Sequence, residues 1–200
     1  MLSQHPQAGS AGELKILGIL ANELLRSHGL LRDRGHIGDV PAEDWEVLAN
    51  EYVRQTRSIV PTHLRPIDTM PPNFRWVGLI RMAIPGARII NCVRSPVEHC
   101  AEMYKKCFGL SGYGFSEDLA ETGRYYQAYL EMMQFWAEIL PGFVLDVDVS
   151  ELLSAPEAGM RRVLDHCGLE FDSACTAPFM SEPRLGESGL LHADDRAARL

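Results

Sequence analysis

Arg94 stands where a buried strand is expected to run into a helix, in the stretch ARIINCVRSPVEHCAEMYKK at residues 87–106. In open α/β sheets, ligands bind at the carboxyl ends of strands, where the free N–H groups of a helix attract anions. Arg94 is therefore a candidate anion ligand. Its neighbours also have an explanation without a ligand, because Ser95, Pro96 and Glu98 form an S-x-x-E capping box with proline at the first helical position.

His99 and Glu102 are three residues apart on the same predicted helix, a spacing that can place two metal ligands side by side. No second pair at ligand spacing accompanies them in the sequence. We therefore expect no metal site and interpret the pair as solvated or packed side chains. His5, His63 and His166 are likewise expected to be structural.

Apolar residues recur at helical spacing in several segments, and two short apolar runs indicate strands. The pattern predicts helices over residues 11–29, 41–59, 74–84, 95–106, 116–139 and 156–168. It predicts strands over residues 87–93 and 142–149.

The run at residues 87–93 is almost continuously apolar, which is typical of a parallel strand covered on both faces. This favours a layered α/β fold over a helical bundle. Residues 176–200 show no period, and we expect them to form a divergent, disordered tail. The length of 200 residues suits one domain, which we place at residues 1–175.

Composition excludes several classes of function. The net charge of −8 argues against nucleic acid as a general partner. No apolar run approaches the roughly 20 residues of a membrane helix, and the first residues lack a signal-peptide pattern, so we expect a cytoplasmic protein without a membrane partner. Five cysteines without a C-x-x-C pair are expected to be reduced core thiols: Cys92, Cys100, Cys107, Cys167 and Cys175.

Four segments, read in order, resemble one known family. They are LSQHPQAGSAGEL, DTMPPNFRWVGLIRMAIPGARIINCVRSPVEHCAEMYKKCF, GRYYQAYLEMMQFW and VLDVDVSELLSAPEAGMRRVLDHCGLEFDSAC. Together they resemble the sulfotransferase domain of bacterial proteins related to tyrosylprotein sulfotransferases. The resemblance covers residues 1 to about 175. It implies a P-loop-like α/β fold with a parallel sheet flanked by helices.

The resemblance also implies an activity and two site residues. The family transfers a sulfuryl group from 3′-phosphoadenylyl sulfate (PAPS) to an acceptor hydroxyl, on a protein tyrosine or a small molecule. Its arginine after this strand binds the 3′-phosphate of PAPS and matches Arg94. Its glutamate in an H-P-x…G-E segment is the base that takes the acceptor proton and matches Glu13. Seen alone, Glu13 would be only an acidic residue in the first turn of a helix.

The sequence departs from the family pattern at several places. The phosphosulfate loop of the form P-R-S-G-T, expected with the first strand just before residue 1, does not occur in the chain. Thr69 stands where the family has a lysine, Glu102 where it has a serine that helps to hold the 3′-phosphate, and Val149 where it has a tyrosine near the adenine. These departures predict an N-terminally truncated sulfotransferase with impaired or no activity.

Two alternatives remain open at the level of sequence. The first is a non-catalytic binding or interaction module that keeps the sulfotransferase fold. The second, a small kinase or similar phosphate-using enzyme, is weakened because no G-x-x-x-x-G-K sequence is present. A missing central strand would expose apolar sheet edge, so we also expect some self-association.

Overall fold

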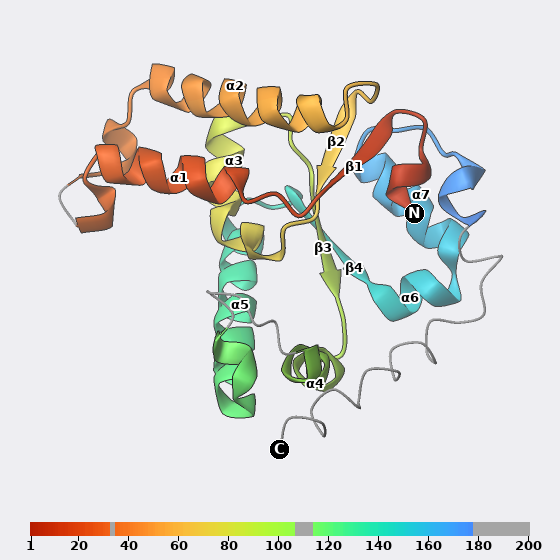
Figure 1. Cartoon of the computed structure of the whole chain (residues 1–200). Coiled ribbons are helices and arrows are strands. Elements are labelled where there is room, and N and C mark those ends of the chain that lie inside the picture. The colour runs from red at the N-terminus through yellow and green to blue at the C-terminus, as the bar shows by residue number, and fades with distance from the viewer. Residues whose placement is uncertain (33–34, 107–113, 178–200) are drawn as a thin grey trace. The chain divides into compact units, whose positions relative to one another are not determined.

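The computed structural model describes residues 1–32, 35–106 and 114–177 (Figure 1). The predicted tail at residues 176–200 and Cys107 therefore lie almost wholly outside the described residues. The chain divides into two compact units. We call residues 2–89 with 136–144 the first unit, and Met1 with residues 90–135 and the described residues from Leu145 the second unit.

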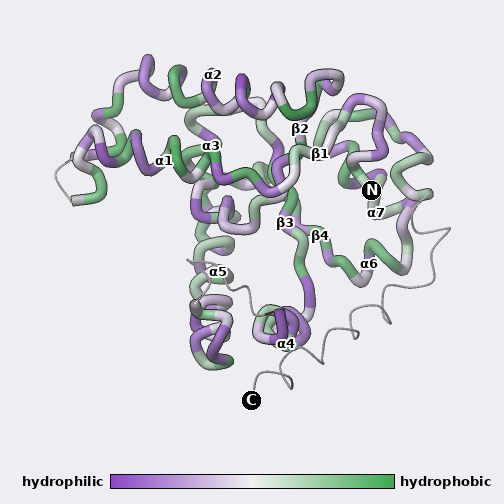
Figure 2. The backbone as a smooth tube through the Cα atoms, viewed as in Figure 1, coloured by the Kyte–Doolittle hydropathy of each residue, from purple (hydrophilic) through white to green (hydrophobic). Residues whose placement is uncertain are grey.

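Three helices form the core of the first unit: α1 (Ile16–Ser27), α2 (Ala42–Ile59) and α3 (Val77–Ala83). Each follows the apolar spacing of its segment, and in Figure 2 hydrophobic and hydrophilic residues alternate along α1 and α2. The buried faces of the three helices meet in one apolar cluster, which Val40 joins from the segment before α2; its helical members are Leu17, Ala21, Leu24, Trp45, Leu48, Leu79 and Ile80.

The first unit also holds a parallel pair of strands, β1 (Ala8–Gly12) and β2 (Arg65–Asp68). Ala8 pairs with Arg65, and after a bulge Gly12 pairs with Asp68. The sequence analysis missed both strands, because AGSAG has no large apolar residue and RPID contains a proline. Between β2 and α3 the chain forms a 3₁₀ helix, η4 (Pro71–Trp76), so the helix predicted over residues 74–84 is α-helical only over Val77–Ala83.

The second unit is built around strands β3 (Ile89–Val93) and β4 (Val144–Asp148), which form a second two-stranded sheet. The other elements are α4 (Pro96–Lys106), η5 (Gly114–Glu117), most of α5 (Leu119–Ile139), α6 (Val149–Ser154), α7 (Pro156–His166) and η6 (Ser173–Cys175). Gly168 follows the C-terminal end of α7 and has a φ of +64°. The sequence analysis predicted that this glycine ends the helix.

The mixed α/β class and both predicted strands are confirmed, but the predicted burial of β3 is wrong. Its residues are half-buried and Cys92 is exposed, because the described strands form two small sheets and not one covered layer. The prediction of core thiols is therefore wrong for Cys92. It holds for Cys167 and Cys175, whose thiols are buried, while the thiol of Cys100 is half-buried.

Candidate functional site

Glu13 lies on the bend between β1 and α1, and its side chain is exposed. The turn begins at Gly12, whose φ of +76° is a conformation that favours glycine. The helix begins only at Ile16, so Glu13 is not a residue of the first helical turn. An exposed carboxylate on a turn at the carboxyl end of a strand can receive a proton from a ligand held above the sheet edge.

Thr69, which stands in the lysine position of the family pattern, lies next to the Glu13 turn. Its backbone N–H donates to the carbonyl oxygen of Gly12 at 2.9 Å. The carboxylate of Asp68 accepts from the backbone N–H of Leu14 at 3.2 Å. The first unit therefore brings together the turns that hold Glu13 and Thr69. The sequence analysis placed both positions in the same site.

Arg94 follows β3 and precedes α4, as predicted, and its side chain is 47% exposed. Its Nη1 donates to Oε2 of Glu102 at 2.9 Å. Glu102 is itself 53% exposed and lies in the middle of α4, the helix that follows Arg94. The arginine predicted to bind a phosphate is thus paired with a carboxylate from the helix that follows it.

His99 lies on the same helix and packs its ring against Tyr126 of α5, with the ring centroids 5.5 Å apart. Burial lowers the pKa of His99, the positive charges of Arg94 and Lys106 lower it further, and the charge of Glu102 opposes them. His99 is therefore best suited to be neutral beside Tyr126, which agrees with a structural role.

A chain of side-chain hydrogen bonds fixes β3, the strand that leads to Arg94. The hydroxyl of Tyr129 donates to Oδ1 of Asn91 at 2.8 Å, and Nδ2 of Asn91 donates to Oδ1 of Asp146 at 2.7 Å. Burial raises the pKa of Tyr129. The bonds connect α5, β3 and β4, so the position of Arg94 depends on all three elements.

Val149, which replaces a tyrosine of the family pattern, is the first residue of α6 and is half-buried. Asp148 caps this helix by accepting from the backbone N–H groups of Ser150 at 2.7 Å and Glu151 at 3.1 Å. Glu13 and Arg94 belong to different units, and each is placed here within its own unit.

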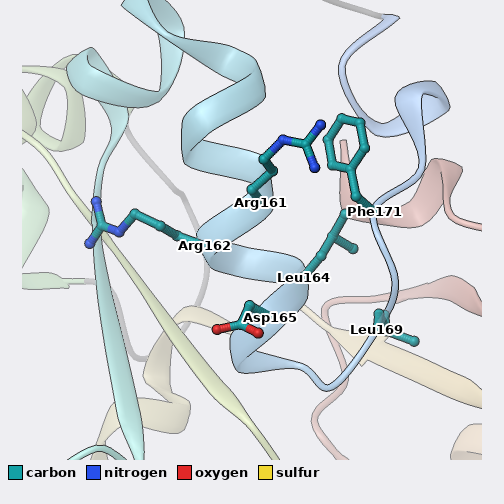
Figure 3. A pocket seen from close by; sticks show the side chains of 6 residues that line it. All are labelled: Arg161, Arg162, Leu164, Asp165, Leu169 and Phe171. Carbon is teal, nitrogen blue, oxygen red and sulfur yellow. The ribbon is translucent and has the colours of Figure 1, made fainter.

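A pocket of about 410 Å³ lies elsewhere, on α7 and the segment that follows it (Figure 3). The guanidinium of Arg161 stacks 3.8 Å from the ring of Phe171, while Arg162 points away from it. Arg161 is also paired with Glu157 at 2.7 Å. Neither Glu13 nor Arg94 lines this pocket, so it does not coincide with the site that the sequence predicted.

Within the parts of the chain that the structure describes, no group of three or more histidine, cysteine, aspartate or glutamate side chains is arranged to hold a metal ion. None of the described helices has the length and apolar character that crossing a membrane requires.

Comparison with known proteins assigns the chain to a family. A family model described as "Sulfotransferase family" matches residues 1–173. The chain belongs to the sulfotransferase family. The chain is also similar to an "Uncharacterized protein" of Aquifex aeolicus (strain VF5), with 25% identity over 86% of this chain and 24% of that protein. It therefore spans about a quarter of the length of the curated relative it matches.

A solved structure shows the same fold. The "Sulfotransferase Domain from the Curacin Biosynthetic Pathway" matches with a TM-score of 0.55 and 15% identity, over 90% of this chain and 72% of that chain. This supports the predicted sulfotransferase fold, with small parallel pairing flanked by helices. At this identity the likeness concerns the fold alone.

Sequence reasoning missed two contributors to the site. Asp68 was read only as part of the D-T-M-P stretch, although an aspartate just after a strand and before a turn is a common acceptor for nearby backbone N–H groups. Asn91, a polar residue inside an apolar strand, was a signal that a buried partner was needed, and Tyr129 supplies it.

Proposed function

We propose that this chain is part of a PAPS-dependent sulfotransferase, and that binding and transfer are impaired in the chain as it stands. In this proposal Glu13 accepts the proton of an acceptor hydroxyl, and Arg94 is the ligand of the 3′-phosphate. The observation that carries the proposal is the family match over residues 1–173, in which both residues follow the ends of strands.

The described residues do not fit PAPS well at the 3′-phosphate. Arg94 already donates to Glu102 at 2.9 Å. A phosphate would have to displace this carboxylate or lie beside it, and two negative charges about 4 Å apart repel by about 1 to 4 kcal/mol, depending on the effective dielectric. Thr69 and Val149 add neither the cation nor the aromatic surface that the family pattern has at their positions.

The proposal is tested by repairing the site. A variant with Thr69→Lys, Glu102→Ser and Val149→Tyr, joined to an upstream strand with a P-R-S-G-T loop and a C-terminal segment from a family member, should bind PAPS. In that background Arg94→Ala should weaken binding, while Glu13→Ala should keep binding and abolish transfer. A repaired variant that binds no PAPS would contradict the proposal.

A non-catalytic interaction module is the second candidate, and the Arg94–Glu102 ion pair favours it. The pair satisfies Arg94 without any ligand, as expected if the fold is kept and the chemistry is lost. If the module is correct, replacing Glu102 should not create affinity for a nucleotide 3′-phosphate.

We further propose that the acceptor carries a hydroxyl group, on a protein tyrosine or a small molecule, and that the domain comprises residues 1–175. A cytoplasmic location and self-association are also proposed. Sedimentation measured over a range of protein concentrations checks self-association, and a single monomeric species at all concentrations would contradict it.

A further inference from the structure

The carboxylate of Asp68 accepts hydrogen bonds from several parts of the first unit. Its Oδ1 accepts from the backbone N–H of Leu14 at 3.2 Å and of Met70 at 2.9 Å. Its Oδ2 accepts from the hydroxyl of Tyr52 at 2.9 Å and from Nδ2 of Asn73 at 3.0 Å. All these donors are neutral, and none of the ion pairs found between described residues includes Asp68.

A single oxygen of Asp68 therefore holds two turns. Leu14 directly follows Glu13, and Met70 directly follows Thr69. The bond to Met70 is local and closes the turn after β2. The donor in the second bond, Leu14, lies 54 residues from Asp68 in the sequence. The local turn after β2 therefore does not account for this bond.

Further contacts support the same arrangement. The backbone N–H of Thr69 donates to the carbonyl of Gly12 at 2.9 Å, which links the two turns a second time. Tyr52 reaches Asp68 from α2, and burial, followed by the charge of Asp68, raises the pKa of Tyr52. Its hydroxyl therefore stays protonated as a donor. The carboxylate is tied on one side to the turns and on the other to a core helix.

We propose that Asp68 is the positioning residue of this site: it fixes the Glu13 turn and the Thr69 turn in one geometry through Leu14 and Met70. We call the bonds from Asp68 to the backbone N–H groups of Leu14 and Met70 the clamp. The inference rests on the proposed role of Glu13, but the clamp itself can be measured without a cofactor. Failure to bind PAPS would therefore count against the proposed function and leave the clamp open to its own test.

The experiment is native-state amide hydrogen exchange, resolved by residue, on the full chain. Asp68→Ser keeps a side-chain oxygen, but on a shorter side chain. This oxygen can still accept from the backbone N–H of Met70, two residues along the chain, but it does not reach the N–H of Leu14. It should speed exchange at Leu14 and Thr69 by about tenfold or more, beyond any change in the amides of α2. Asp68→Asn keeps an Oδ1 acceptor and should restore most of the protection. Tyr52→Phe keeps the carboxylate and both of its bonds to the turns, so it should speed exchange there far less than Asp68→Ser does.

The clamp is contradicted if Leu14 and Thr69 exchange as in wild type in Asp68→Ser, or if their change only follows that of every other amide. Failure of Asp68→Asn to restore protection would also contradict it. If Asp68→Ser does not fold, amide hydrogen exchange of the wild-type protein is measured at a series of urea concentrations instead. The amides of Leu14, Thr69 and Met70 should then open together with one opening free energy, and independent opening would overturn the proposal.

Discussion

Arg94 and Glu102 form an ion pair at 2.9 Å, which joins the end of β3 to the middle of α4. Both side chains are about half exposed, so the pair itself adds little to the free energy of folding. The pair matters for binding, because the carboxylate of Glu102 already occupies the guanidinium group that we propose as the ligand of a phosphate.

The pair should also influence His99, whose pKa is lowered by burial and by nearby positive charge. Because Glu102 opposes this shift, we expect Glu102→Ser to lower the pKa of His99 further. Titration of the His99 ring followed by NMR in the two proteins measures the change. An unchanged or higher pKa in the variant would contradict the described environment.

The same pKa shift predicts a dependence of stability on pH. The unfolded chain binds a proton at His99 near pH 6.5, and the folded chain binds it only at lower pH. The unfolded state therefore holds more protons as the pH falls below about 6.5, and the contribution of His99 to stability is full above that value and lost below it.

His99→Gln isolates this contribution, since the other titrating groups cancel in the difference. The free energy of unfolding of wild type minus that of His99→Gln should fall between pH 7.5 and pH 5, as measured by urea denaturation. A difference that stays constant over this range would show that His99 titrates alike in both states.

Gly78 and Trp136 provide a test of packing in the first unit. A Cβ atom at Gly78 would lie 2.7 Å from the Trp136 ring, whose Nε1 donates to the carbonyl of Phe74 at 3.2 Å. Gly78→Ala should therefore cost about 1 to 3 kcal/mol of stability and change tryptophan fluorescence.

Gly123→Ala is the matched control for that substitution. Gly123 also lies in a helix, α5, but a Cβ atom there meets no atom within 4 Å. The variant should gain up to about 1 kcal/mol from helix propensity. Equal effects of the two substitutions would mean that Trp136 does not contact Gly78.

The bond between Tyr129 and Asn91 predicts a further effect on stability. Tyr129→Phe removes the donor to Oδ1 of Asn91 and should cost about 0.5 to 1.5 kcal/mol, measured by urea denaturation. The substitution keeps the ring, so the loss reports the hydroxyl alone. A Tyr129→Phe variant as stable as wild type would contradict the assigned importance of this bond.

Local patterns predicted the elements whose stability comes from an amphipathic face. Helices α1, α2 and α7 follow their apolar spacing, and β3 and β4 their apolar runs. The pair β1 and β2 could not be predicted in this way. AGSAG has little strand propensity of its own, and it is a strand because its backbone pairs with RPID more than fifty residues later.

The site shows the same division. The place of Arg94 after a strand could be read from the sequence, and so could the conflict between Glu102 and a phosphate. The direct hydrogen bond between Arg94 and Glu102 could not be read from the sequence, because it depends on the turn between β3 and α4. The link from Asp68 to Leu14 depends on a pairing between distant segments, which no local pattern contains.

The central claim is that Arg94 is a phosphate ligand held by Glu102, and a calorimetric titration with adenosine 3′,5′-bisphosphate tests it most directly. Wild type should bind weakly or not at all, Glu102→Ser should bind about five- to tenfold more tightly, as expected for loss of roughly 1 kcal/mol of repulsion, and Arg94→Ala in that background should remove the gain. Equal affinity of wild type and Glu102→Ser, or a gain that persists without Arg94, would contradict the claim.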